Sequence, residues 1–231
     1  MSSARGSLDV FNSVLTRWNR SQQISPPPGT VKVNLGSYLL VEPGWLNVEG
    51  TIHAFLAKKT TALARLMYRF SKVGQVFDTE SQYVKVLQNN TFIHHDLSYG
   101  LPFPDNSVDF IYSSHVLEHL YPSVAQNLLR DAYRALKRGG RIRVCIPDLK
   151  HAIDLYFDGQ KAEALDYFFQ GPEVGGFHRH KYMYDFEMLK SVLEHSAFVS
   201  VEKCSYRQGL VPDIEKLDNR PEETLFVEAA K

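Results

Sequence analysis

The chain has 231 residues, of which 44% are hydrophobic, which is enough for one globular domain with a sizeable core. Its 26 Lys and Arg residues equal its 26 Asp and Glu residues, so the overall charge does not indicate nucleic acid as a partner. Because no apolar run is long enough to span a bilayer and the amino terminus lacks an apolar signal core, we expect a soluble, cytoplasmic protein.

The first predicted element is an amphipathic helix that starts near Ser7, because Leu8, Phe11, Leu15 and Trp18 recur on one stripe. The proline-rich stretch 25–29 ends it. We therefore divide the chain into an amino-terminal helix and linker, residues 1–30, and one main domain, residues 31–231.

Seven strands and at least two further helices are predicted in the main domain. A helix is expected from about Pro122 to Lys137, with Gly139 and Gly140 as its carboxyl-terminal cap, and another is capped by Asp185. The alternation predicts an α/β fold, a Rossmann-like, mostly parallel sheet with helices on both faces. The strands are expected at 30–37, 44–50, 91–96, 109–114, 141–147, 198–207 and 224–231.

Residues 51–90 form a helical insert between the second and third predicted strands. Its segment 53–72 is amphipathic and contains five Lys and Arg residues but no acidic residue. We expect a lid, a homodimer helix, or a peripheral contact of residues 51–75 with an anionic membrane surface. The apolar side is predicted to consist of Phe55, Leu56, Leu63, Leu66, Met67 and Phe70.

The residues that end the strands are the best candidates for a ligand site, because such sheets bind ligands beyond the carboxyl ends of their strands. A glycine turn after the first strand lets the backbone approach a ligand closely. Glu49 can accept from both hydroxyls of a ribose, and Asp96 can accept from the exocyclic amine of adenine. The set predicts an adenosine site. The strand-end residues are Gly36, Ser37, Glu49, Asp96, Ser114, His115 and Asp148.

Two other kinds of site are less well supported by the sequence. A dinucleotide site would require GxGxxG, which is absent, and the Tyr133 and Lys137 pair that matches short-chain reductases lies at a helix end. The residues His115, Glu118 and His119 spell the HxxEH pattern of a zinc peptidase helix. That chemistry needs a helix through His115, whereas residues 107–114 are predicted to form a strand, so we expect no metal.

The sequence resembles the class I S-adenosylmethionine-dependent methyltransferases, in their type 11 branch. The resemblance rests on an ordered set of motifs: "VNLGS", "GWLNVEG", "HHDLSYGLPFPDNSVDFIYSSHVLEHLY", "LKRGGRIRVCIPDL" and "HRHKYMYDFEMLK". It implies S-adenosyl-L-methionine as cofactor. The cofactor-binding residues that it implies are Leu35, Gly36, Ser37, Glu49, Gly50, Asp96, Leu97, Ser114 and His115.

The resemblance also suggests O-methylation of a saccharide or other small hydroxyl acceptor, in glycan biosynthesis. A histidine can remove the proton of a neutral hydroxyl, and the candidates for this catalytic base are His115, His178 and His180. The loop 171–185 is expected to cover the acceptor, with Arg179 and Tyr182, together with Asp148, as substrate-binding residues. Tyr38 stands where many relatives have a second glycine. It favours an alternative, a catalytically inactive partner or scaffold protein, and an NAD(P)-dependent reductase is a further alternative.

Overall fold

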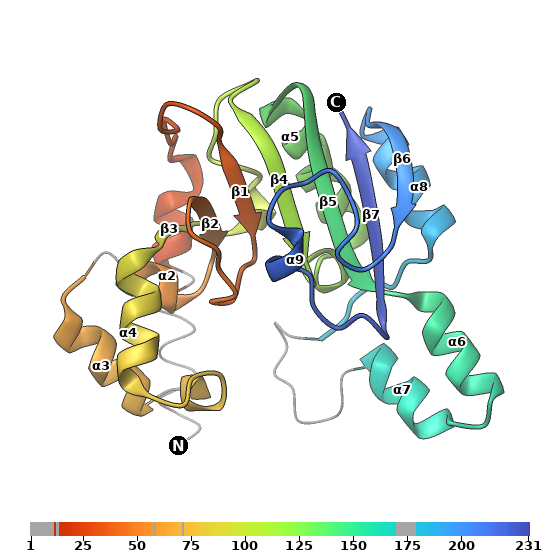
Figure 1. The fold of residues 1–231 in the computed structure, drawn as a ribbon, viewed down its shortest axis with the longest axis horizontal. Coiled ribbons are helices and arrows are strands. Elements are labelled where there is room, and N and C mark those ends of the chain that lie inside the picture. The colour runs from red at the N-terminus through yellow and green to blue at the C-terminus, as the bar shows by residue number, and fades with distance from the viewer. Residues whose placement is uncertain (1–11, 13, 58, 71, 170–178) are drawn as a thin grey trace.

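A computed structural model describes residues 12, 14–57, 59–70, 72–169 and 179–231, and it contains a seven-stranded sheet (Figure 1). The strand order is β3-β2-β1-β4-β5-β7-β6. All neighbouring pairs among the first five of these strands are parallel, and β7 runs antiparallel to both β5 and β6. The predicted α/β class and mostly parallel sheet are therefore confirmed. The strands are β1 (Lys32–Leu35), β2 (Trp45–Glu49), β3 (Thr91–His94), β4 (Val108–Ser114), β5 (Leu136–Pro147), β6 (Val199–Cys204) and β7 (Thr224–Ala230).

The strand order reverses between β1 and β4, which places the topological switch point at the carboxyl ends of these two strands. In their register, Leu35 of β1 lies beside Ser113 of β4 and Val48 of β2. The strands are short and almost completely buried, as expected for a parallel sheet that is covered on both faces. The residues that follow β1, β2, β3 and β4 consequently share one edge of the sheet.

Different elements cover the two faces of the sheet (Figure 1). On one face lie α5 (Pro122–Ala135) and α8 (Phe186–His195), which contribute to the main hydrophobic core. On the other lie the segment 205–218 and α9 (Ile214–Leu217), which pack on Trp45, Tyr112 and Phe226. Asp185 caps α8 by accepting a hydrogen bond from Met188 N at 2.8 Å, as predicted.

The helix predicted for 122–137 ends earlier than expected and has no glycine cap. Its last residue is Ala135, and Leu136 is already extended. Leu136 pairs with Val108 of β4 and is completely buried, so strand pairing and core packing determine where the helix ends. Gly139, with φ +77°, instead lies in an irregular stretch near the start of β5.

The amino-terminal segment is attached to the edge formed by β2 and β3. Residues 14–18 are helical and lead into η1 (Asn19–Ser21). Asn12 Nδ2 donates to Gly50 O at 2.6 Å, and Gln22 Nε2 donates to His94 O at 2.9 Å. Trp18, which was predicted on the apolar stripe, is 84% exposed, and Leu8 and Phe11 lie outside the described residues.

The insert is helical, but its amphipathic segment is divided into two short helices. These are α2 (Ile52–Ala57) and α3 (Thr61–Phe70), followed by η2 (Lys72–Gln75) and α4 (Glu80–Asn89). The apolar residues do not share one face: Leu56 is buried, whereas Leu63 and Leu66 of α3 are exposed. The reason is that α2 packs against α4 and β3, while part of α3 faces outward.

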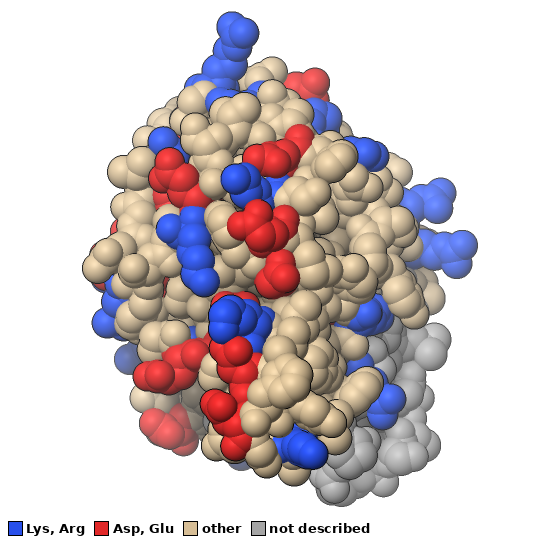
Figure 2. Space-filling view, turned by 90° about the vertical axis from the view of Figure 1, so that its right-hand side faces the viewer, with Lys and Arg blue, Asp and Glu red and all other residues tan. Residues whose placement is uncertain are grey.

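Two helices after β5 were not predicted, α6 (Leu149–Phe157) and α7 (Lys161–Phe169). None of the helices in the described part of the chain has the length and apolar character that a membrane span requires. On the face shown in Figure 2, Lys and Arg side chains are interspersed with Asp and Glu side chains, in line with the balanced composition.

Candidate active site

The turn after β1 requires glycine at Gly36. This residue has φ +63°, and a Cβ atom there would lie 2.4 Å from Cγ2 of Val116, which follows β4. Gly36 N also donates to Val48 O at 2.8 Å. Glycine is therefore needed because the turn, with buried Leu35 and Ser37, packs closely against Val116 after the end of β4 at the switch point.

The Glu49 carboxylate at the end of β2 points toward this turn. It is only 2% exposed and accepts hydrogen bonds from Tyr38 N at 2.7 Å, Ser37 Oγ at 3.1 Å and Thr51 Oγ1 at 2.7 Å. Burial raises the pKa of Glu49 above its usual 4.5, and the three donors counteract this effect. Two of the donors are hydroxyls, the same groups that a ribose offers.

Asp96 and Leu97 follow β3 directly beside the end of β2. His95 N donates to Glu49 O at 3.0 Å, and a Cβ atom on Gly50 would lie 3.6 Å from Asp96 Cα. Asp96 Oδ1 caps η3 (Leu97–Tyr99) by accepting from Ser98 N at 2.9 Å. The backbone at the end of β2 therefore lies against the residues that begin the next loop.

Two histidines at this edge were not among the predicted site residues. His94 and His95 are buried, and desolvation is the largest cause that lowers the pKa of each. His94 Nε2 lies 2.9 Å from Oδ1 of Asn12. Their position immediately before Asp96 is the only feature of the sequence that points to them. The contact with Asn12 joins residues that are far apart in the sequence, so it could not be predicted.

Ser114 and His115 end β4 at the switch point, as predicted. His115 has φ +53°, a left-handed conformation that few non-glycine residues adopt. Its Nδ1 lies 3.2 Å from Oε1 of Glu118, and its Nε2 lies 3.4 Å from Oγ1 of Thr224. Ser114 Oγ accepts from Asn219 Nδ2 at 3.4 Å. Asn219, before the start of β7, and Thr224, at its start, therefore lie next to the end of β4.

Glu118 lies in η4 (Leu117–His119), so no α-helix runs through His115 and the HxxEH geometry of a zinc peptidase is not formed. Its backbone oxygen accepts from Lys181 N at 2.7 Å, which attaches the segment after residue 178. His180 is consequently close, with its ring 5.2 Å from that of His119. Burial is the largest cause that lowers the pKa of His180. His178 lies outside the described residues.

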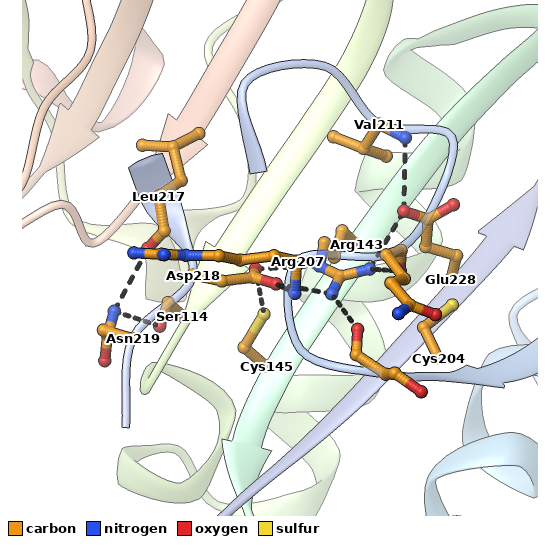
Figure 3. Close-up of polar contacts among 12 residues, drawn as sticks. Ser114, Arg143, Cys145, Cys204, Arg207, Val211, Leu217, Asp218, Asn219 and Glu228 are labelled. Atoms are coloured by element: carbon orange, nitrogen blue, oxygen red, sulfur yellow. Dashed lines mark hydrogen bonds and ion pairs between the residues drawn. The ribbon is translucent and has the colours of Figure 1, made fainter. Parts of the chain in front are cut away.

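A buried ion-pair network holds the segment 205–218 against the sheet (Figure 3). The guanidinium of Arg143 on β5 is completely buried and uses all five of its N–H donors. It binds Asp218 through two hydrogen bonds, of 2.9 and 2.6 Å, and Glu228 through one of 3.1 Å. The remaining two donors bind backbone oxygens of residues 205 and 208. The network therefore positions Asn219 beside Ser114.

The predicted substrate residues do not share one hollow. Asp148 caps α6 by accepting from Lys150 N at 3.0 Å, and it lines a hollow of about 270 Å³ with Phe186 and Lys203. Tyr182 lines a separate hollow of about 460 Å³ beside α8. Arg179 is exposed, and its backbone oxygen lies 3.3 Å from Nδ1 of His119.

Comparisons with known proteins found one family model and several solved structures that are similar to this chain. A family model described as "Methyltransferase domain" matches residues 60–144, a span that includes Asp96, Ser114 and His115. A SAM-dependent methyltransferase from Archaeoglobus fulgidus is 20% identical, with 98% of this chain and 96% of that chain covered and a TM-score of 0.46. A structure from Thermotoga maritima, described as a SAM-dependent methyltransferase and possible histamine N-methyltransferase, is 14% identical, with coverage of 97% and 98% and a TM-score of 0.49.

The family match covers part of the chain, residues 60–144. The matched span reaches from the insert to β5. Glu49, at the end of β2, lies outside it. Over residues 60–144 the chain is thus similar to the methyltransferase domain family.

Proposed function

We propose that this protein transfers the methyl group of S-adenosylmethionine to a hydroxyl oxygen of a saccharide or another small acceptor. The cofactor, when bound, supplies an electrophilic methyl group. One observation carries the proposal: an imidazole, that of His115, lies at the switch point beside the buried carboxylate of Glu118. A neutral hydroxyl needs a base when it acts as a nucleophile, and a histidine paired with a carboxylate is suited to this role.

The cofactor residues that we propose lie along the edge formed by β1, β2 and β3. Glu49 would exchange the hydroxyl donors Ser37 and Thr51 for the two hydroxyls of the ribose, at little cost in hydrogen bonding. Asp96 would accept from the amine of adenine, next to Leu97. The remaining contacts would come from Leu35, Gly36, Gly50, Ser114 and His115.

His115 is the first candidate for the catalytic base. Its Nδ1 lies 3.2 Å from Oε1 of Glu118, and its Nε2 lies 3.4 Å from Oγ1 of Thr224, so the proton of an acceptor hydroxyl would be taken up at Nε2 when Nδ1 carries the imidazole proton. His178 and His180 are the other candidates, because they belong to the segment that follows α7. Arg179, Tyr182 and Asp148 remain candidates for holding the acceptor.

The insert offers a surface for the carrier of the acceptor or for a second copy of the chain. On α3, Leu63 and Leu66 are exposed and lie near Arg65 and Arg69 in sequence. Apolar and basic side chains together are typical of helices that lie on an anionic membrane surface. We propose a peripheral contact of this kind through residues 51–75, in a cytoplasmic protein of glycan biosynthesis.

A second candidate function, an inactive partner protein, is favoured by Tyr38. This side chain is exposed and has φ +39° in the turn where the cofactor would bind. Isothermal titration with S-adenosylmethionine and S-adenosylhomocysteine separates the two functions, because an enzyme binds both and a scaffold need bind neither. NAD(P) binding in the same experiment would instead favour a reductase.

Methyl transfer itself is tested with radiolabelled cofactor and a panel of saccharide acceptors. His115→Ala should lower turnover at least about 100-fold, the scale of general-base catalysis, with S-adenosylhomocysteine binding retained. His195→Ala, at the exposed end of α8, is the matched control. Full turnover in His115→Ala and in the corresponding variants of His178 and His180 would refute a histidine base.

A further inference from the structure

Three side chains near the end of β4 come together as a set of metal ligands. Glu118 and His119 belong to η4. His180 lies 61 positions after His119 in the sequence, beyond the end of α7. Each offers one ligand atom, and these atoms all lie within 4.8 Å of one another. Only two of the three belong to the HxxEH sequence, so the set is distinct from the helical motif that the sequence suggested.

The buried carboxylate of Glu118 accepts no hydrogen bond from the described residues. The side chain is 1% exposed, and neither Oε1 nor Oε2 has a hydrogen-bond donor among the described residues. Two histidine nitrogens lie at longer ion-pair distances from Oε1, His115 Nδ1 at 3.2 Å and His119 Nε2 at 3.9 Å. Burying an ionised carboxylate without donors is unfavourable, and buried charges in proteins are therefore paired or bound to metals.

Both ligating histidines are held in the tautomer that a metal requires. His180 Nδ1 lies 2.8 Å from the backbone oxygen of Tyr167, and His119 Nδ1 lies 3.3 Å from that of Arg179. Because a carbonyl oxygen only accepts, each Nδ1 carries the proton, and each Nε2 keeps its lone pair. Metal-binding histidines in proteins are oriented by this type of backbone contact.

We propose that Glu118, His119 and His180 form a binding site for a divalent transition-metal cation, with Zn²⁺ as the best match. Two histidines and one carboxylate leave a fourth position of a tetrahedral Zn²⁺ site for water or a ligand oxygen. With bonds of about 2.0–2.2 Å, the ligand atoms must move together by about 1 Å from their present separations. A loop can accommodate a shift of this size, and His180 lies outside the helices and strands.

The position of the cation suggests a role in binding the acceptor. His115 Nδ1 contacts the same carboxylate, so a metal on Glu118 would lie within roughly 5–7 Å of the proposed base. A hydroxyl oxygen in the open position would be acidified and fixed next to His115. This role rests on the proposed methyl transfer, whereas the metal site itself does not.

The test is a titration of the full chain with Co²⁺, a spectroscopic substitute for Zn²⁺, followed by displacement with Zn²⁺. The wild type should develop visible ligand-field absorption at one equivalent, and Zn²⁺ should remove it. Glu118→Gln and His180→Ala should each bind Co²⁺ at least about 100-fold more weakly, since each removes one ligand. His195→Ala is the control and should bind like the wild type.

Far-UV circular dichroism distinguishes loss of the site from loss of the fold, and Glu118→Gln preserves the volume of the side chain. Absence of Co²⁺ and Zn²⁺ binding by the folded wild type, or unchanged binding by folded Glu118→Gln and His180→Ala, would overturn the proposal. Failure of the proposed function would look different: S-adenosylhomocysteine would not bind, while the metal titration would remain intact.

Discussion

The ion-pair network around Arg143 makes a quantitative prediction about stability. Replacing Arg143 with Met removes the five hydrogen bonds of the guanidinium and leaves Asp218 and Glu228 buried without their cation. Breaking a buried pair by removing one partner costs about 3–5 kcal/mol. For a protein of this size, that loss corresponds to a fall in Tm of roughly 6–20 °C.

Urea denaturation followed by far-UV circular dichroism measures this loss directly. Arg130→Met, on the exposed side of α5, is the matched control and should change the free energy of unfolding by less than about 0.5 kcal/mol. Adding Asp218→Asn to Arg143→Met should restore part of the stability, because one of the two buried carboxylates left without a cation is then neutral. A loss below about 1 kcal/mol for Arg143→Met would refute the view that the network holds the segment 205–218 in place.

Three further predictions concern the cofactor edge and the insert. Gly36→Ala should lower stability by about 1–3 kcal/mol in urea denaturation, because φ is positive and Val116 occupies the space of the new Cβ; a neutral effect would show that the turn adapts. Glu49→Gln should weaken S-adenosylhomocysteine binding about 10- to 150-fold by isothermal titration, since hydrogen bonds to a charged group contribute about 1.5–3 kcal/mol, with exposed Glu163→Gln as the control; equal affinities would contradict the ribose assignment. Burial lowers the pKa of His53 to about 4, so protonation favours the unfolded state and stability should fall by about 2–3 kcal/mol between pH 6.5 and 4.5. His53→Gln should lack most of this loss in urea denaturation at the two pH values, and an unchanged pH dependence would assign it to other groups.

Local signals were sufficient to predict the sheet and most of its edge. Short apolar runs between turn residues located β1, β2 and β4, and the capping residue Asp185 located the start of α8. Parallel strands then place the residues after them on one side, so the neighbourhood of Gly36, Glu49 and His115 followed from topology alone.

Features that depend on contacts between distant segments were not predictable in this way. Leu136 leaves the helix because it pairs with β4, and no residue near it in sequence signals this. The proximity of Glu118 and His180 depends on how the chain returns after α7. The helices α6 and α7 were not predicted, although Asp148, which caps α6, is a local helix-start signal.

The attachment of the amino-terminal segment to β2 and β3 affects how the unit of folding should be defined. Asn12 and Gln22 donate to carbonyl oxygens at the ends of these strands, and Asn12 also contacts His94. A fragment that begins at residue 31 would lack these amide donors and leave Gly50 and His94 to solvent. Residues that contribute no strand to the sheet thus help to build the edge next to the proposed adenosine site, and a shortened protein would present this edge in an altered form.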